Sequence, residues 1–464
     1  MNPLFERSVY VSRRDRLAEA VGHGIAVFLG NHEAPMNYPD NTYNFRQDSD
    51  FLYFFGLSVA DIAAVIDFDA RKSMIFGNDF GIDDVIWMGD QPTVASLAEK
   101  VGVSETHPFA MLADFIQQAR QQGRKVHFTP PYRGDNQILL ANLTGINVNT
   151  IRDEASLELI KGIVALRSAK EQCEIDEMDK ACEIGVRMHT AVMRRCHEGE
   201  SERELAGLAE GIALSFGNGI SFPVILSQHG ETLHNHAHDG ILKAGNMLLM
   251  DAGAEGLMNY CSDYTRTMPV NGKFTTKQQE IYEIVLKANL DAIDAARPGL
   301  YNKELHRLSC EVIAQGLKDL GLMKGDVKEA VELGAHALFM VHGLGHQIGL
   351  DVHDMEGLGQ IHVGYDETVR PSKIFGWASL RMARELKPGF VVSIEPGIYF
   401  IPHLIDIWKK EKKFENFINY DVVDKYRDFG GIRIEDDLLI TETGHRVLGP
   451  HLPKTVGELA EIIG

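Results

Sequence analysis

Short apolar runs and stretches of helical periodicity alternate along the first third of the chain. Apolar runs bounded by polar turns, which are typical of strands, lie at residues 25–30, 50–56, 63–67 and 73–77. Helical spacing of apolar positions is found at residues 8–21, 94–101 and 109–122. We therefore predict a mixed α/β domain over residues 1–160. The aromatic run at 51–55 is interpreted as a buried strand in preference to a binding platform.

Beyond residue 160 the pattern changes to long helices and strands that occur in blocks. Amphipathic spacing predicts helices at 165–196, 202–216, 277–296 and 302–320, with a short helix closing the chain. Ser201 and Glu204 have the spacing of a capping box for the second of these helices. Strands are predicted at 222–227, 246–252, 258–268, 390–399 and 432–441. Such blocks favour an α+β domain over residues 161–464 and argue against a doubly wound parallel sheet.

Charge and cysteine content limit the classes of partner and compartment. Lys and Arg number 46 against 66 Asp and Glu, a net charge of −20. Such a chain repels phosphate backbones and anionic lipid, so we expect neither nucleic acid nor a membrane as partner. Five cysteines without a CxxC pair argue against a disulfide framework or a thiolate zinc knuckle. With no signal peptide and no uncharged apolar run of about 20 residues, a cytoplasmic protein is expected.

Two aspartates are placed so that they could share a cation. Asp251 ends an apolar strand, and Asp263 follows a turn that contains glycine. On a hairpin, neighbouring like charges are destabilising unless a cation lies between them. The alternative is a pair of exposed turn aspartates, which is what most aspartates are.

Two glutamates and a histidine extend this set. Glu395 and Glu435 each interrupt an apolar, strand-like run, and burying an unpaired carboxylate costs several kcal/mol, which favours a functional role over a solvent-facing one. His346 lies in the glycine-rich stretch HGLGHQIGLDVH, between His342 and His353. A lone histidine there would more often be a core residue, but the cluster favours function. Four carboxylates and one imidazole suit Mn²⁺, Co²⁺ or Fe²⁺ better than a closed zinc site, and could hold two ions that activate a water.

Several stretches resemble the motifs of one enzyme family. HGLGHQIGLDVHD, SIEPGIYF, DAGAE followed by SDYTRTMPVNGKFT, and GIRIEDDLLIT are similar to motifs of the pita-bread metallopeptidases, which include prolidase (Xaa-Pro dipeptidase), aminopeptidase P, methionine aminopeptidase and creatinase. This resemblance covers residues 165–464. FRQDSDFLYFFG, at residues 45–56, resembles the N-terminal domain that prolidase and aminopeptidase P share.

The resemblance implies a pita-bread catalytic domain with two divalent metal ions. It implies these metal ligands: Asp251, Asp263, His346, Glu395 and Glu435. Asp263 and Glu435 would bridge the ions, and Glu395 would handle the proton of the metal-bridged water. Mn²⁺ is expected first, with Co²⁺, Fe²⁺ or Zn²⁺ as alternatives. A homodimer formed through the N-terminal domain is also implied.

Further residues are implied to act on the substrate. His342 and His353 would contact substrate and steady the tetrahedral intermediate. His234 corresponds to the substrate-side histidine of the family, and Arg433 would orient the site. The neighbours of His234, His236 and His238, are interpreted as bystanders on the same strand face.

One departure from the family pattern concerns the aspartates. Eleven residues separate Asp251 from Asp263, where the family usually has ten. One extra residue turns a strand side chain to the opposite face unless a bulge or a longer turn absorbs it. Residues 255–259 are the expected place for this adjustment.

The choice among peptidases depends on Arg381. Residues 378–389 resemble the arginine-bearing insertion of prolidases, and a guanidinium can grip the terminal carboxylate of a dipeptide through two hydrogen bonds. The alternative is a solvated helix arginine. We expect a small peptide with proline at its second position as substrate, and thus an Xaa-Pro dipeptidase. Aminopeptidase P, acting on longer Xaa-Pro peptides, is one alternative. A non-catalytic binding protein on the same scaffold is another, although such a relative would be expected to lose metal ligands.

Overall fold

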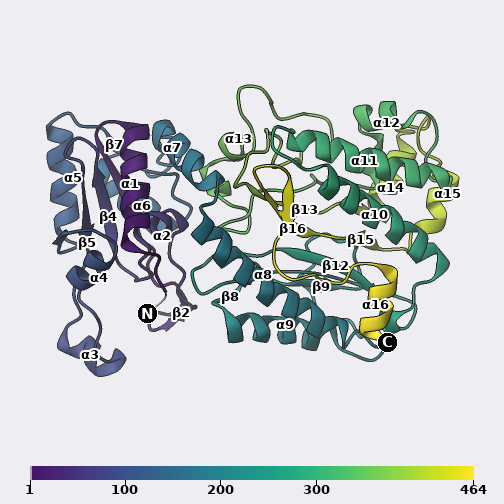
Figure 1. Ribbon diagram of the computed structural model, residues 1–464, viewed down its shortest axis with the longest axis horizontal. Coiled ribbons are helices and arrows are strands. Elements are labelled where there is room, and N and C mark those ends of the chain that lie inside the picture. Colours follow the sequence, from purple (N-terminus) through teal and green to yellow (C-terminus); the bar gives the residue numbers. More distant parts are fainter. Residues whose placement is uncertain (1–2) are drawn as a thin grey trace. The chain divides into compact units, whose positions relative to one another are not determined.

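The computed structural model describes residues 3–464, which form two compact units (Figure 1). The first unit comprises the chain up to Arg167 together with Met355–His362. The second comprises Ser168–Asp354 and Val363–Gly464. No helix within residues 3–464 has the length and apolar character needed to cross a membrane.

The first unit is built on a mixed five-stranded sheet. Its strand order is β6-β5-β4-β1-β7, from Glu105–His107, Lys72–Phe76, Ala63–Asp67, Ile25–Leu29 and Val126–His127. The two central strands are buried along their whole length. The helices of this part are α1 (Arg7–Val21), α2 (Ser49–Phe55), α3 (Ile82–Met88), α4 (Val94–Lys100), α5 (Met111–Gln121), α6 (Gly134–Thr144) and α7 (Leu157–Ser168). A hairpin of β2 (Pro35–Tyr38) and β3 (Asn41–Thr42) completes it.

The aromatic run at 51–55 is a helix, so the strand predicted there is wrong. Asp48 caps α2 by accepting a hydrogen bond from the backbone of Phe51, and Gly56 ends it with φ 65°. Every residue of the helix is buried. A segment that is apolar on all sides carries no periodicity, so only the capping residues could have distinguished helix from strand.

The second unit consists of small sheets covered by helices. Its first half contains α8 (Gln172–Met193), α9 (Glu202–Phe216), β8 (Gly219–Ile220), β9 (Ile225–Ser227), β10 (Met247–Ala252), β11 (Ala254–Glu255) and β12 (Tyr264–Pro269). Its second half contains α10 (Thr276–Ala295), α11 (Asn302–Asp319), α12 (Val327–Leu333), β13 (Val391–Ile394), β14 (Gly397–Tyr399), α14 (Pro402–Lys410), α15 (Tyr420–Val423), β15 (Gly431–Arg433), β16 (Asp436–Ile440), β17 (His445–Val447) and α16 (Val456–Ile463).

Each half of this unit places a long helix against its strands. Helix α8 packs on β10, β11 and β12, and α10 packs on β13, β14 and β15 (Figure 1). A bridge between Thr265 and Glu435 connects the strands of the two halves. Helices thus cover the outer faces and leave the inner faces of the strands for a shared site. The predicted α+β class with two domains is confirmed.

Two helix predictions in this part need correction. The single helix predicted over 165–196 is interrupted after Ser168, and α8 begins at Gln172 with a capping box formed by Glu171 and Glu174. The predicted capping box of Ser201 and Glu204 is absent, because the Ser201 side chain accepts no capping hydrogen bond. The Ser201 backbone pairs with Ile241 instead.

Two of the predicted strands are each divided into two shorter strands. The strand predicted over 390–399 is split into β13 and β14 at Glu395 and Pro396, and the strand over 432–441 is split into β15 and β16 at Ile434 and Glu435. Proline cannot donate to a strand ladder, which explains the first break. In both cases the chain leaves regular pairing at a glutamate that the sequence identifies as a candidate ligand.

Candidate metal centre

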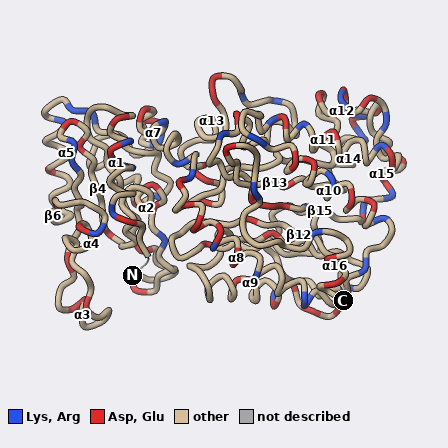
Figure 2. Tube along the Cα trace, viewed as in Figure 1, with Lys and Arg blue, Asp and Glu red and all other residues tan. Residues whose placement is uncertain are grey.

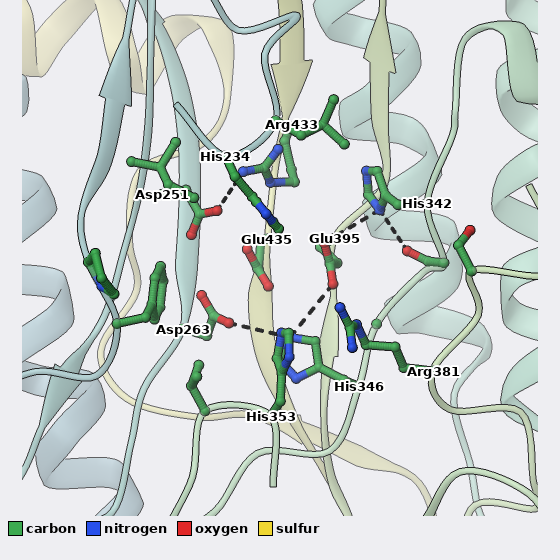
Figure 3. Close-up of a pocket in the computed structure, with 18 of the residues that line it drawn as sticks. His234, Asp251, Asp263, His342, His346, His353, Arg381, Glu395, Arg433 and Glu435 are labelled. Atoms are coloured by element: carbon green, nitrogen blue, oxygen red, sulfur yellow. Dashed lines mark hydrogen bonds and ion pairs between the residues drawn. The ribbon is translucent and has the colours of Figure 1, made fainter. Parts of the chain in front are cut away.

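The candidate ligands come from five places in the second unit and meet in one cavity of about 590 Å³ (Figure 3). Asp251 lies near the end of β10, and Asp263 directly precedes β12. Glu395 follows β13, and Glu435 lies between β15 and β16. His346 lies in the glycine-rich loop, beside a bridge between Gln347 and Val392. The structure thus brings together all the side chains that the sequence proposes as ligands.

The two aspartates lie on the same face of their sheet. Asp251 pairs directly with Thr265 in the antiparallel register of β10 and β12, so their side chains share a face. Asp263 is two residues before Thr265 and therefore points the same way. The extra residue is absorbed in the preceding turn, where Asn259 has φ 67° and Glu255 bridges to Cys261.

The histidine lies among the carboxylates. Atoms of Asp263, His346 and Glu435 that could bind a metal ion all lie within 4.8 Å of one another. The His346 Nε2 atom is 3.4 Å from an Asp263 oxygen and 3.7 Å from a Glu395 oxygen. The other ring nitrogen, Nδ1, lies 3.1 Å from the Gln347 carbonyl and donates to it, which leaves Nε2 free to accept a cation.

Burial and mutual repulsion shift the pKa values of these groups. Burial raises the pKa of Glu395 to about 8, with Asp251 adding to the effect and Arg433 opposing it. Burial, reinforced by neighbouring carboxylates, raises the pKa values of Asp263 and Glu435 well above their usual range. Burial holds the pKa of His346 well below its usual value, so this imidazole is neutral.

These residues fit a cluster of divalent cations. Asp251 Oδ1 and Asp263 Oδ1 are buried without a hydrogen-bond partner, although a buried carboxylate oxygen normally has one. Arg433 pairs with Asp251 Oδ2 at 2.5 Å and Arg381 lines the same cavity, but two guanidinium groups cannot neutralise four carboxylates. A neutral imidazole and carboxylate oxygens are ligands that manganese, iron, cobalt and zinc accept.

A chain of hydrogen bonds beside the ligands fixes the orientation of His342. Arg433 Nη1 donates to Tyr399 Oη at 2.8 Å, and this hydroxyl donates to His342 Nε2 at 2.8 Å. His342 Nδ1 then donates to the Gly343 carbonyl at 2.8 Å. Burial, followed by the charge of Arg433, lowers the pKa of His342 to about 3, so this histidine is neutral.

The remaining predicted site residues also line the cavity. His353 packs against His346 with ring centroids 4.1 Å apart, and Arg381 lies near Glu395 (Figure 3). His234 lines the cavity, and burial with the nearby charge of Arg433 lowers its pKa. The segment around it is a loop and not the strand face inferred from the sequence. His236 lines the cavity as well, whereas His238 bonds to the Leu226 carbonyl outside it.

Two polar residues of the site, Tyr399 and Thr265, were not predicted from the sequence. Tyr399 connects Arg433 to His342, as described above. Thr265 donates to Glu435 at 2.6 Å and accepts from Arg433 Nε at 3.0 Å. Both residues lie inside motifs that the sequence analysis quotes, but their partners are more than 30 positions away along the chain. Only the register between strands could have indicated them.

Acidic and basic residues are interspersed along both units (Figure 2). The concentration of carboxylates at the site is therefore a local feature of the cavity. It follows from the placement of specific side chains, and not from the overall charge of −20 alone.

Comparison with known proteins gives two family matches. Residues 176–442 match the model described as metallopeptidase family M24, and residues 10–127 match that of the aminopeptidase P N-terminal domain. The first match contains every residue of the cavity described above.

Individual relatives cover nearly the whole chain. A human Xaa-Pro dipeptidase is 32% identical over 97% of this chain and 92% of its own length. A probable Xaa-Pro aminopeptidase of Sordaria macrospora is 32% identical over 95% of this chain and 91% of its own. The structure of zinc-substituted Escherichia coli aminopeptidase P in complex with product is similar with a TM-score of 0.80 and 28% identity, covering 99% of both chains.

Proposed function

We propose a peptidase reaction for this cavity, on the premise that the chain belongs to metallopeptidase family M24. The proposed substrate is an Xaa-Pro dipeptide, and the proposed reaction is hydrolysis of its single peptide bond. The relatives named as Xaa-Pro dipeptidases and Xaa-Pro aminopeptidases support a substrate with proline at its second position.

The position of Arg381 is the main support for the dipeptide proposal. This residue lines the same cavity as the carboxylate cluster, and its positive charge acts on Glu395, His342 and His346. A dipeptide has its terminal carboxylate one residue beyond the scissile carbonyl. A guanidinium near the reacting centre can therefore bind that carboxylate, whereas the carboxylate of a longer peptide lies farther away.

The five carboxylate and imidazole side chains would hold two divalent cations, with Mn²⁺ as the proposed metal. When bound, such ions supply Lewis acidity and make a water nucleophilic near neutral pH. Glu395 lines the cavity beside the other proposed ligands and would accept and return a proton during hydrolysis. His353 lines the cavity and would donate a hydrogen bond to the charge that develops on the substrate oxygen. His342, whose two ring nitrogens are held by Tyr399 and the Gly343 carbonyl, would contact the substrate through its ring.

Selection for proline would depend on shape, because a proline nitrogen in a peptide bond carries no hydrogen to donate. Apolar side chains of Phe222, Ile225 and Val352 line the cavity together with the polar groups. Such a surface can pack against a pyrrolidine ring and a neighbouring apolar side chain.

The second candidate is an aminopeptidase P activity on longer Xaa-Pro peptides. The relatives include both activities at similar identity, which favours neither. The deciding experiment compares hydrolysis of Ala-Pro and Ala-Pro-Ala-Ala by the purified protein, with and without Mn²⁺. Hydrolysis mainly of the dipeptide supports our proposal, and hydrolysis mainly of the longer peptide supports the alternative. If neither peptide is cleaved in Mn²⁺, Co²⁺, Fe²⁺ or Zn²⁺, the binding-protein hypothesis replaces both.

Two further expectations accompany this function. We propose a homodimer formed through the N-terminal domain and a cytoplasmic location. Light scattering of the purified protein tests the first, since a mass near 52 kDa would contradict it. Fractionation of source cells tests the second.

A further inference from the structure

A second cluster of metal-binding side chains lies outside the carboxylate cavity. His306 and Cys310 are four residues apart on α11, so they occupy the same helix face. His336 lies in a short 3₁₀ helix, Ala335–Leu338, that follows α12. Atoms of these three residues that could bind a metal ion all lie within 4.8 Å of one another. None of them lines the cavity of the candidate metal centre.

The cluster also contains a thioether and is closed by an indole. Met340 Sδ is 4.0 Å from Cys310 Sγ, and Cys310 Sγ is 3.6 Å from the nearer ring nitrogen of His306. Trp377 packs edge-on against both imidazoles, with ring centroids 4.9 Å from His306 and 6.2 Å from His336. The histidines, the cysteine and Met340 are fully buried, and Trp377 is half-buried, so the cluster lies one side chain beneath the surface.

The burial of the His336 side chain indicates that the cluster binds a ligand. Its side chain is buried, and the Val331 carbonyl can serve one ring nitrogen at most, so the other nitrogen has no hydrogen-bond partner among the described residues. The nearby carbonyl of Val331 accepts a hydrogen bond from the Trp377 indole at 2.9 Å. A buried polar group without a partner costs about 1–3 kcal/mol in a folded protein. A Cys310–His306 hydrogen bond would account for two members of the cluster but not for His336.

We propose that His306, Cys310 and His336 bind one soft metal ion, Cu⁺ in preference to Zn²⁺, with Met340 as a weaker fourth ligand. Two imidazoles, a thiolate and a thioether form a soft ligand set, similar to the His₂Cys arrangement with a distant methionine that proteins use for copper. In a tetrahedral site with metal–ligand bonds of 2.0–2.3 Å, neighbouring ligand atoms lie roughly 3.5 Å apart. The sulfur–nitrogen distance of 3.6 Å already matches this spacing, and the three ligand atoms lie within 4.8 Å of one another.

The net charge of the occupied site favours Cu⁺ over Zn²⁺. Binding releases the thiol proton, so the ion is added to one negative thiolate and neutral imidazoles. Cu⁺ then gives a site with no net charge, whereas Zn²⁺ leaves one uncompensated positive charge in a buried place, which is unfavourable. The charged residues whose fields reach His306 and Cys310 are Arg307 and Glu311, and neither is buried.

Burial prepares the imidazoles as ligands. It lowers the pKa of His306 well below its usual value and that of His336 to about 4, so both rings are neutral and can bind a metal. Burial raises the pKa of the Cys310 thiol, so the apparent affinity for Cu⁺ rises with pH. The ion would connect α11 to the segment that leads into His342.

The test is a Cu⁺ titration of the full-length protein. The carboxylate cavity is first filled with Mn²⁺, and Cu⁺ is then added without oxygen, under reducing conditions, in competition with bicinchoninate. We expect one Cu⁺ per chain, with affinity at least about tenfold weaker in Cys310→Ser and in His336→Gln. Cys196→Ser is the matched control, because Cys196 is equally buried but its sulfur has, within residues 3–464, only the Pro269 carbonyl as partner. This control should bind like the wild type.

A readout on the wild-type protein makes the test independent of variant folding. X-ray absorption of the Cu⁺-loaded protein should show sulfur and nitrogen scatterers together. Absence of stoichiometric Cu⁺ binding, nitrogen and oxygen scatterers only, or a preference for Zn²⁺ would each overturn the proposal. So would equal affinity in folded Cys310→Ser and Cys196→Ser.

Discussion

At the residue scale, Arg381 is the side chain whose replacement best separates the two proposed substrates. Arg381→Ala removes the guanidinium that would bind a dipeptide carboxylate. We expect kcat/KM for Ala-Pro to fall by roughly 100-fold, as for the loss of a charged hydrogen bond, with less than about a threefold change for Ala-Pro-Ala-Ala. Steady-state kinetics on both peptides measure this. Arg370→Ala, at an exposed position earlier in the chain and outside the cavity lining, is the control. Equal losses of kcat/KM on both peptides would refute the proposal that Arg381 binds the dipeptide carboxylate.

Tyr399 is the corresponding test of the hydrogen-bond chain. Tyr399→Phe removes the hydroxyl that connects Arg433 to His342 but keeps the ring. We expect kcat to fall by roughly tenfold with little change in KM, because an oriented His342 is needed mainly in the transition state. Tyr282→Phe, a buried tyrosine bonded to the Lys454 carbonyl, should leave kcat unchanged. An unchanged kcat in Tyr399→Phe would mean that His342 is oriented by packing alone.

At the scale of elements, the glycine-rich loop depends on close contact with β13. A Cβ atom at Gly345 would lie 1.9 Å from the Ser393 carbonyl oxygen, which no rearrangement of side chains can relieve. Gly345→Ala should therefore lower the free energy of unfolding by about 2 kcal/mol or more and weaken metal retention. Gly207→Ala, on α9 with nothing within 4 Å, should instead stabilise the protein by roughly 0.5–1 kcal/mol. Urea unfolding measures both. If Gly345→Ala were as stable as the wild type, the loop would not need this contact.

The strands predicted around Glu395 and Glu435 failed for a reason that also belongs to the scale of elements. Apolar periodicity identified the runs around Glu395 and Glu435, yet each is two short strands separated at the glutamate. Leaving the ladder there frees the carboxylate to point into the cavity. The pattern of apolar residues indicates which positions are buried but not which strands pair. It therefore cannot show that a buried run leaves one partner strand and pairs with another.

At the scale of the whole molecule, the carboxylate cluster should couple stability to pH and to metal. Without metal, the folded protein keeps Glu395 protonated up to about pH 8, whereas its usual pKa is 4.5. The folded state therefore binds more protons than the unfolded chain in this window. The stability from this group is complete below its usual pKa and is lost as the pH rises toward 8.

Divalent cations should reverse this trend. They bind only the folded carboxylate cluster and compete with protons, so their stabilising effect increases with pH. Thermal melting between about pH 5 and pH 9, in EDTA and in Mn²⁺, measures this. We expect the melting temperature to fall with pH in EDTA and to stay level or rise in Mn²⁺. Parallel pH profiles in the two conditions would contradict the coupling.

The sequence by itself determined the class of the fold, the types of residue at the site and their chemistry. Carboxylates that interrupt apolar runs, together with a histidine in a glycine-rich loop, were sufficient to indicate a metal centre, because burying such groups is costly unless a cation compensates them. The register between strands was decided only by the tertiary structure. It set Asp263 on the face of Asp251 despite the extra residue, and it connected Tyr399 and Thr265 to Arg433. Pairing between distant strands depends on contacts across the fold, and these leave no local pattern in the chain.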